Sequence, residues 1–185
     1  MPSNSLPSLS PDIRLFGNVG EDMLSEFFRQ QSEIKPGSEP LVFELSTSGG
    51  DADMGRRIAD EIRLWQRERE VYFLGKTFVF SAGVTIMAAF PPSRRFMTAG
   101  CEILIHERKM KKNIHLEGAL RGCRSLLLDA LAEVDSGQRL ERAGFESLVE
   151  GTPLTAEDVQ RQVLDKDWYL TAEEAVKTGL IAGVI

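Results

Sequence analysis

The sequence of 185 residues contains few cysteines and no long apolar run. Its two cysteines, Cys101 and Cys123, form no CxxC pair, so neither a disulfide framework nor a zinc site is expected. We expect both to be buried thiols, and we expect no metal or other cofactor. No apolar run approaches the roughly 20 residues that a membrane-spanning helix requires, so the chain is not expected to cross or bind a membrane.

The N-terminus lacks the features of a secretory signal. Residues 1–11 are polar and contain prolines, whereas a signal has a charged start and an apolar middle. We expect a flexible arm over 1–11, a single domain over 12–185 and a cytoplasmic protein. Basic charge is also scarce, since the formal net charge is −6. A dedicated nucleic-acid binder needs a basic surface to displace counterions, so that class of function is not expected.

The chain alternates short β-like runs with helical patterns, which predicts an α/β domain with largely parallel strands. The predicted strands are rich in β-branched, aromatic or leucine residues, and they cover 12–19, 41–46, 71–75, 94–98 and 102–106. Helical spacing of apolar residues predicts helices over 53–66 and 81–90. A further stripe from Leu116 to Val134 is longer than one core of this size needs, so we expect this helix to project.

The C-terminal region carries its own helix signals. Thr171 and Glu174 have the spacing of a capping box, in which each side chain satisfies a free backbone N–H at the helix start. Gly179 is placed to end that helix. The closing residues 180–185 read as a last strand or a tail packed on the core.

Three residues together suggest nucleophilic acyl transfer, which needs a hydroxyl, an imidazole beside it and a carboxylate that orients the imidazole. Ser81 follows a strand-like run and opens a stretch of small residues, which places it at a helix start. His106 ends the predicted strand 102–106, and Asp167 lies in the turn before the capped helix. Each signal is weak alone, but their order makes Ser81, His106 and Asp167 a candidate triad.

Acyl transfer also needs two backbone N–H groups that face the developing oxyanion. The N–H of Ala82 is one candidate, because it begins the predicted helix after the nucleophile. The turn at Gly49 and Gly50 is the other, since glycine lets backbone N–H groups approach a ligand without an intervening Cβ.

From about Ile13 to Val184 the chain resembles the proteolytic subunit of the Clp protease, within the ClpP/crotonase superfamily. LVFELSTSGGDADMGRRIADEIR resembles the family's strand, Gly-Gly turn and helix, and SAGVTIMAAFPPSRRFMTAGCEILIHE resembles its nucleophile-to-histidine segment, with the same spacing of 25 residues. LDKDWYLTAEEAVKTGLI resembles the aspartate turn and the helix after it. The resemblance implies a ClpP/crotonase-like fold of stacked β-sheet layers flanked by helices.

The same resemblance implies a serine endopeptidase that cleaves peptides or unfolded polypeptides through an acyl-enzyme, with Ser81, His106 and Asp167 as its triad. It also implies a homo-oligomer of stacked heptameric rings and a possible unfoldase ATPase as a partner. Asp165 and Lys166 match an acid–base pair of the family that reaches across the interface between rings.

The sequence departs from the family pattern at several positions. Ser48 replaces the proline before the Gly-Gly turn, and Val79 and Phe80 replace small residues before the nucleophile. The glycine-rich strand that pairs with substrate in the family is replaced by ERKMKKNIHLEG, residues 107–118. Activity on ordinary Clp substrates is therefore not implied. Little of the family's axial N-terminal loop is present, so docking of an ATPase does not follow either.

Three alternatives stay open. A Ser-Lys dyad through Lys76 requires a buried lysine, which its neighbours do not suggest. His115, the other histidine, reads as a surface or interface residue, so His106 is the better base. A crotonase-type thioester enzyme would use the backbone donors but gives the triad residues no role. A ring scaffold with weak or no activity would keep the fold and lose the substrate strand.

Overall fold

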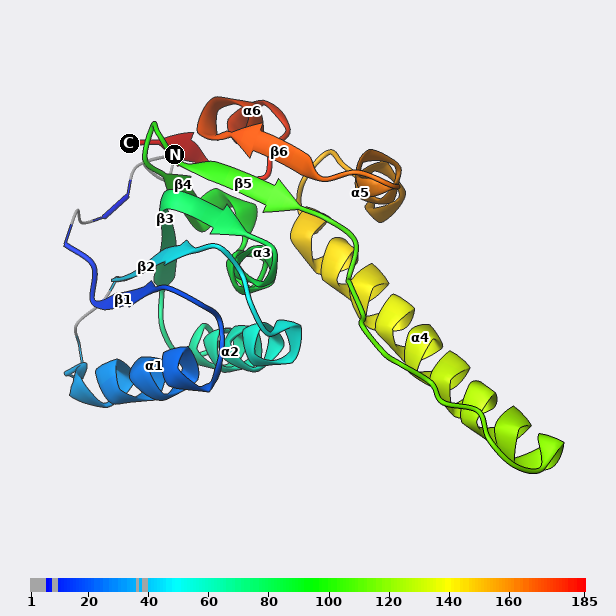
Figure 1. The fold of residues 1–185 in the computed structure, drawn as a ribbon. Helices are drawn as coiled ribbons and strands as arrows, with labels where there is room; N and C mark the ends of the chain where they lie inside the picture. Colours follow the sequence, from blue (N-terminus) through cyan, green and yellow to red (C-terminus); the bar gives the residue numbers. More distant parts are fainter. Residues whose placement is uncertain (1–5, 8–9, 36, 38–39) are drawn as a thin grey trace.

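A computed structural model describes residues 6–7, 10–35, 37 and 40–185. Most of the predicted arm over residues 1–11 lies outside the described residues. The chain forms a seven-stranded sheet with helices packed around it and one helix that projects from the body (Figure 1). The strands are β1 (Ile13–Phe16), β2 (Leu41–Thr47), β3 (Val71–Phe80), β4 (Arg95–Met97), β5 (Glu102–Ile105), β6 (Trp168–Thr171) and β7 (Gly183–Val184). The helices are α1 (Glu21–Glu33), α2 (Ala52–Trp65), α3 (Ala82–Met87), η1 (Pro92–Arg94), α4 (Leu120–Val149), α5 (Ala156–Val163) and α6 (Ala172–Lys177).

The sheet branches at its longest strand, β3. Its path runs β1-β2-β3-β4-β7 with parallel pairing throughout. The first half of β3 pairs with β4, and the second half pairs with β5, also in parallel. Strand β6 then pairs with β5 in the antiparallel direction. The predicted α/β class with largely parallel strands is confirmed.

The core lies between the sheet and helices α1 and α2, which lie below β1–β3 in Figure 1. Its centre is aromatic: Phe27 of α1 meets Phe43 of β2 at 6.0 Å and Trp65 of α2 at 5.9 Å, both edge-on. Phe90 contacts Phe43 and Phe73 at 5.6 and 5.3 Å. Edge-to-face rings at these distances add to the stabilisation from burial. The core therefore fixes β2 and β3, whose ends carry the candidate site.

Helix α4 packs on the body only through its C-terminal end. Its buried residues are Ala130, Phe145, Leu148 and Val149, although the helix has 30 residues. The extended segment from residue 107 to 119 runs alongside it, joined by an ion pair between Lys112 and Glu133 (Figure 1). The prediction of a long projecting helix is confirmed, although its first residue is Leu120, so that Leu116 belongs to the extended segment.

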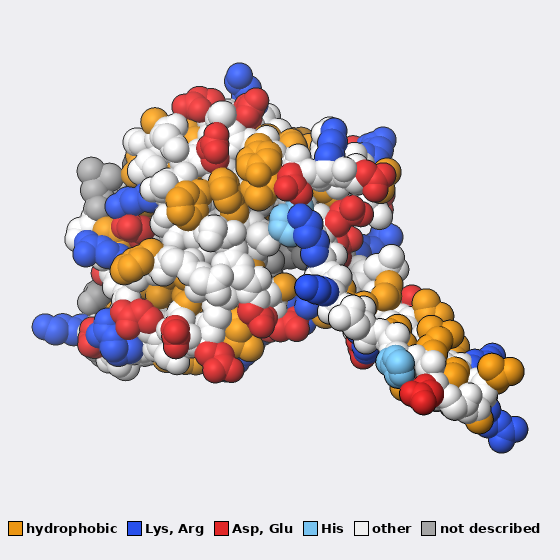
Figure 2. All heavy atoms as spheres, in the orientation of Figure 1, with side chains coloured by type: hydrophobic (Ala, Val, Ile, Leu, Met, Phe, Trp, Pro, Cys, Tyr) orange, Lys and Arg blue, Asp and Glu red, His pale blue; other side chains and the backbone are white. Residues whose placement is uncertain are grey.

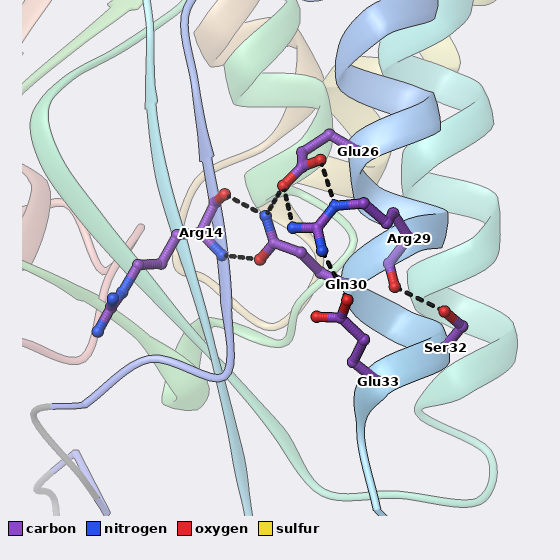
Figure 3. A network of polar contacts seen from close by, with 6 residues as sticks. All are labelled: Arg14, Glu26, Arg29, Gln30, Ser32 and Glu33. Carbon is purple, nitrogen blue, oxygen red and sulfur yellow. Dashed lines mark hydrogen bonds and ion pairs between the residues drawn. The ribbon is translucent and has the colours of Figure 1, made fainter.

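Helix α1 covers the open edge of β1, the outermost strand of the sheet path. The side chain of Gln30 accepts from the N–H of Arg14 at 2.7 Å and donates to its carbonyl at 2.9 Å (Figure 3). Glu26 holds Gln30 in place and also binds Arg29; these bonds lower the pKa of the Glu26 carboxyl to about 2, with Arg29 as the main cause. An amide side chain thus occupies backbone groups that could otherwise pair with another chain.

The two cysteines differ in environment. Cys101 is buried, and burial raises the pKa of its thiol to about 12, so it is an unreactive core residue. Cys123 is only half-buried because this part of α4 extends into solvent, so the expectation of a buried thiol was wrong there. Within the part of the chain that the structure describes, no helix is long and apolar enough to span a membrane. The same residues contain no group of three or more potential metal ligands from His, Cys, Asp and Glu.

Buried Arg95 donates hydrogen bonds to backbone carbonyls near the C-terminal ends of three helices. Arg95 of β4 is 1% exposed, and its guanidinium donates to the carbonyls of Phe90 at 2.7 Å, Leu148 at 2.9 Å and Leu180 at 3.1 Å, with a longer bond to Ala88. Removal from water lowers the pKa of Arg95 to about 10, which leaves it charged near neutral pH. One side chain thereby satisfies a carbonyl in the last turn of α4 and carbonyls that follow α3 and α6.

We predict that Arg95→Met destabilises the fold by about 3 kcal/mol or more, because it strands several buried carbonyl groups. The measurement is the urea midpoint, with the slope of the transition checked for constancy. The control is Arg94→Met, since Arg94 is partly exposed and pairs with Glu70 at the surface. Its expected cost is within about 0.5 kcal/mol. Equal losses in the two variants would contradict this role.

Candidate active site

The three candidate triad residues lie at the ends of three neighbouring strands. Ser81 follows the last residue of β3, and His106 follows the last residue of β5. These strands are parallel, so their carboxyl ends meet at one edge of the sheet. Strand β6 runs antiparallel to β5, so Asp167, which precedes β6, comes to the same edge. Sheet topology thus brings together residues that are far apart in the sequence.

Ser81 has an unusual backbone. Its φ of 55° and ψ of −117° are rare for a residue with a side chain and turn the chain from β3 directly into α3. The N–H of Ser81 donates to the carbonyl of Leu104 at 2.9 Å, which anchors the turn to β5. Strain of this kind costs about 1–3 kcal/mol and persists where the surroundings fix it.

His106 contacts Ser81 directly. Its Nε2 lies 2.9 Å from the Ser81 Oγ, and its Nδ1 lies 2.5 Å from the carbonyl oxygen of Glu107. A carbonyl can only accept, so Nδ1 must carry the proton in this bond. In a neutral ring Nε2 is then the acceptor for the serine hydroxyl. This tautomer is the one that a general base acting on Ser81 requires.

The carboxylate of Asp167 is not joined to His106. It pairs with Lys109, with 3.6 Å between the Asp167 Oδ1 and the Lys109 Nζ, and both side chains are exposed. The ladder between β5 and β6 ends at the pair of Ile105 and Trp168, and His106 and Asp167 are the residues next to that pair at the same edge of the sheet. Asp167 is thus a neighbour of His106 whose carboxylate is held elsewhere.

The glycine turn after β2 packs against the nucleophile. A Cβ on Gly49 would lie 2.7 Å from the Cβ of Ser81, and Gly49 also has a φ of 103°. A Cβ on Gly50 would lie 2.3 Å from the carbonyl oxygen of Val19. Only glycine fits either position, so the backbone of this turn lies next to Ser81 as the sequence suggests.

A cavity of about 260 Å³ opens beside Ser81 and His106. One wall is α2, with Arg56, Asp60 and Arg63, and the floor is α3. The opposite wall is the C-terminal half of α4, including Leu140 and Phe145. The pocket is thus largely apolar with several charged groups, and the Ser81 hydroxyl lies at its border.

The other residues singled out in the sequence lie in separate places. Asp165 has a φ of 58°, and its N–H donates to the Glu107 carboxylate at 3.4 Å. The N–H of Lys166 donates to the carbonyl of Val163 at the end of α5. Lys76 forms an ion pair with Glu44, with 2.8 Å between its Nζ and the Glu44 Oε2, so its amine binds an acid instead of Ser81. His115 is exposed and contacts Glu117, away from Ser81.

Two features of the site were missed in the sequence. The backbone carbonyl of Glu107 orients His106, and a backbone acceptor leaves no trace in residue type. The charged wall of the pocket did leave a signal. Arg56, Asp60 and Arg63 recur at intervals of four and three residues, which places them on one face of α2.

Comparison with known proteins agrees with this architecture. The sequence model of the Clp protease family matches residues 10–185. The proteolytic subunit 2 of the ATP-dependent Clp protease of Treponema pallidum is 27% identical over 175 residues, covering 94% of this chain and 81% of that protein. The proteolytic subunit 3 from Rhizobium johnstonii is 26% identical over 178 residues, covering 95% and 84%.

A solved structure shares the fold. A ClpP1 mutant from Listeria monocytogenes superposes with a TM-score of 0.71 at 20% sequence identity, covering 94% of this chain and 90% of that one. Because the family model matches residues 10–185, the chain belongs to the Clp protease family.

Proposed function

We propose that this protein is a serine endopeptidase that cleaves peptides or unfolded polypeptides, with Ser81 as nucleophile and His106 as general base. The observation that carries the proposal is the 2.9 Å contact between the His106 Nε2 and the Ser81 Oγ, together with the bond that fixes the proton on Nδ1. A serine in a strained turn beside a correctly oriented imidazole is an arrangement suited to acyl transfer.

The proposed reaction follows from this geometry. His106 Nε2 accepts the hydroxyl proton as the Ser81 Oγ attacks the scissile carbonyl, and it then gives that proton to the leaving amine. The acyl-enzyme that remains is hydrolysed by water, which His106 activates in the same way. Each step uses one proton that moves between Oγ, Nε2 and the leaving group or water.

We propose that the oxyanion is held by the backbone N–H groups of Ala82 and Gly50, since the N–H of Gly49 donates to the Thr47 Oγ1 at 3.1 Å. The N–H of Ser81 donates to the carbonyl of Leu104. Ala82 is the first residue of α3, so its N–H has no acceptor within that helix. The bridge between the glycine turn and Val19 uses the carbonyl of Gly49 and the N–H of Asp51. The N–H of Gly50 therefore takes no part in that bridge.

The third member of the proposed triad is Asp167. In the described conformation the Glu107 carbonyl takes the place that a carboxylate would take at Nδ1, and Lys109 holds Asp167. The cross-strand position of Asp167 supports an exchange in which its carboxylate leaves Lys109 and accepts from Nδ1. A carboxylate stabilises the imidazolium that forms during the reaction better than a carbonyl does.

We propose that the active form is a homo-oligomer of stacked heptameric rings in the cytoplasm, as the family resemblance implies. The exposed leucines of α4 support assembly. Figure 2 shows hydrophobic side chains along this projecting helix that the body of the molecule does not cover. Asp165 and Lys166 remain the proposed contact between rings. An unfoldase ATPase is a possible partner, since the matched bacterial subunits belong to ATP-dependent proteases.

A small fluorophosphonate should label Ser81, and the label should disappear in Ser81→Ala. His106→Ala should slow labelling by about a hundredfold or more, because general-base catalysis is lost. His115→Ala is the matched control and should label at the rate of the wild type. The readout is the modified peptide by mass spectrometry.

An unlabelled Ser81 in folded, ring-sized protein would favour the inactive scaffold. Labelling that is unchanged in His106→Ala would remove the histidine from the mechanism. Turnover of an acyl thioester without peptide cleavage would favour the crotonase-type alternative.

The exchange at Asp167 can be tested through Lys109. Lys109→Met should raise the labelling rate several-fold, since the freed carboxylate can orient and stabilise His106. Adding Asp167→Asn should cancel that gain. Lys111→Met removes an equal charge from the same exposed segment and should change nothing. If Lys109→Met and Asp167→Asn both label like the wild type, Asp167 is not part of the site and the Glu107 carbonyl alone orients His106.

Assembly predicts a particle mass of many subunits by multi-angle light scattering. Leu131→Glu should lower this mass sharply, because it places a charge on an apolar face of α4. The Leu131 side chain is 57% exposed in the single chain. Leu64→Glu, at a 51% exposed leucine on α2, is the control and should leave the mass unchanged. A monomeric wild type at working concentration would refute the ring proposal.

A further inference from the structure

The pocket beside Ser81 has an ordered distribution of charge. Along one face of α2, Ala52, Arg56, Asp60 and Arg63 follow one another on successive turns into the pocket. The first turn of α2 lies against the start of α3, because a Cβ on Gly55 would lie 3.0 Å from the carbonyl oxygen of Ala82. Arg56 therefore enters the pocket near the nucleophile, whereas Arg63 lies two turns farther along.

The far end of the pocket is neutral. The Arg63 guanidinium donates to Asp60 at 2.9 Å and to the hydroxyl of Ser147 on α4 at 2.9 Å. Ser147 in turn donates to the carbonyl of Ala88 at 3.3 Å. These bonds join α2 to α4 and close this end of the pocket, so Arg63 has a structural role in the pocket wall.

Arg56 is different, because its neighbours are engaged elsewhere. Its ion pair with Asp53 is long, at 3.6 Å between the Arg56 Nη1 and the Asp53 Oδ1. The Asp53 carboxylate instead accepts from Arg108 at 2.8 Å, and this bond is the main reason that its pKa is lowered. The opposite wall has one carboxylate, Glu141, which accepts from the backbone N–H of Arg108. The guanidinium of Arg56 thus lines the pocket and shares Asp53 with Arg108, which binds that carboxylate at the shorter distance.

Resting on the proposed peptidase function, we propose that Arg56 recognises the side-chain carboxylate of an acidic residue whose own carbonyl is attacked by Ser81. The cavity of about 260 Å³ is below the roughly 300–1,000 Å³ of small-molecule sites and suits a single side chain. Val84, Leu140 and Phe145 provide apolar surface for its methylene groups. A planar guanidinium matches a carboxylate with two parallel hydrogen bonds.

The test compares peptides that differ only in the residue before the scissile bond: Glu, its neutral isostere Gln, or Lys. Wild type should cleave the Glu peptide with a kcat/KM at least about tenfold above that for Gln. Arg56→Gln should abolish this ratio, and Arg56→Lys should keep part of it. Arg57→Gln is the matched control: Arg57 is the adjacent arginine, is paired with Glu61 and does not line the pocket, so the ratio should persist.

A second variant tests the pocket itself. A Cβ on Gly144, in the α4 wall, would meet no atom within 4 Å and would extend into open space. Gly144→Leu should therefore fold normally and lower cleavage of the Glu and Gln peptides alike. Unimpaired cleavage of the Glu peptide by this variant would overturn the assignment of the pocket. A preference for Lys that disappears in Glu141→Gln would also overturn it, because Glu141 would then be the recognising charge.

Binding separates this inference from the proposed function. The same peptides, made fluorescent, are titrated into the Ser81→Ala protein, and anisotropy gives the affinity without turnover. Tighter binding of Glu than of Gln that depends on Arg56 supports the pocket assignment even if wild type cleaves nothing, in which case only the peptidase proposal fails. Equal affinity for the Glu and Gln peptides refutes recognition by Arg56 whether or not the enzyme is active.

Discussion

The site depends on the backbone turn at Ser81. A strand that ended in an ordinary conformation would not place a hydroxyl at the sheet edge and begin a helix at the next residue. The positive φ at Ser81 does both, and its cost is offset by the bond to Leu104 and by the close packing of Gly49 against the serine. Because Gly49 and Gly50 must lack a Cβ here, the glycine turn and the nucleophile constrain each other.

The second constraint is the strand register around β5. Parallel pairing with β3 brings Ser81 beside His106, and antiparallel pairing with β6 brings Asp167 to the same edge of the sheet. The segment that follows His106 then adds two charged side chains next to the site. Arg108 engages Asp53, and Lys109 engages Asp167. The same short segment therefore contacts the proposed orienting carboxylate and also lines the pocket.

Much of the fold followed from local patterns, and what was missed has physical reasons. Helix α2 agrees with its prediction to one residue at each end, and the capping box of Thr171 and Glu174 is confirmed. Strand β3 runs to Phe80, five residues beyond its prediction, because Gly75 and Lys76 look like a turn. The sequence does not reveal that the ladder continues past an irregularity, with Thr77 at a φ of 61°.

Strand β6 and helices α1 and α5 were not predicted. Strand β6 has only four residues and gains its stability from β5, a non-local partner. Helix α5 did carry a signal in the capping box of Thr155 and Asp158, but the closing position of this box holds Asp in place of the usual Glu or Gln.

The candidate site was likewise predictable only in part. Ser81 and His106 were predictable because order and spacing restrict them, and the structure places them in contact. The pairing of Asp167 with Lys109 was not predictable, because two exposed side chains choose among several partners of similar energy. The role of the Glu107 carbonyl was hidden for a different reason: every residue has a carbonyl, so only three-dimensional geometry reveals which one a histidine meets.

The tautomer of His106 tests the central claim most directly. The chain has two histidines, so ¹⁵N-labelled imidazole signals can be assigned by comparison with a His115→Gln variant. At a pH where the ring is neutral, the account predicts a protonated Nδ1 and an unprotonated Nε2, with the Nε2 signal changing in Ser81→Ala. A proton on Nε2, with Nδ1 bare, would contradict the account, because that ring could not accept the hydroxyl proton of Ser81.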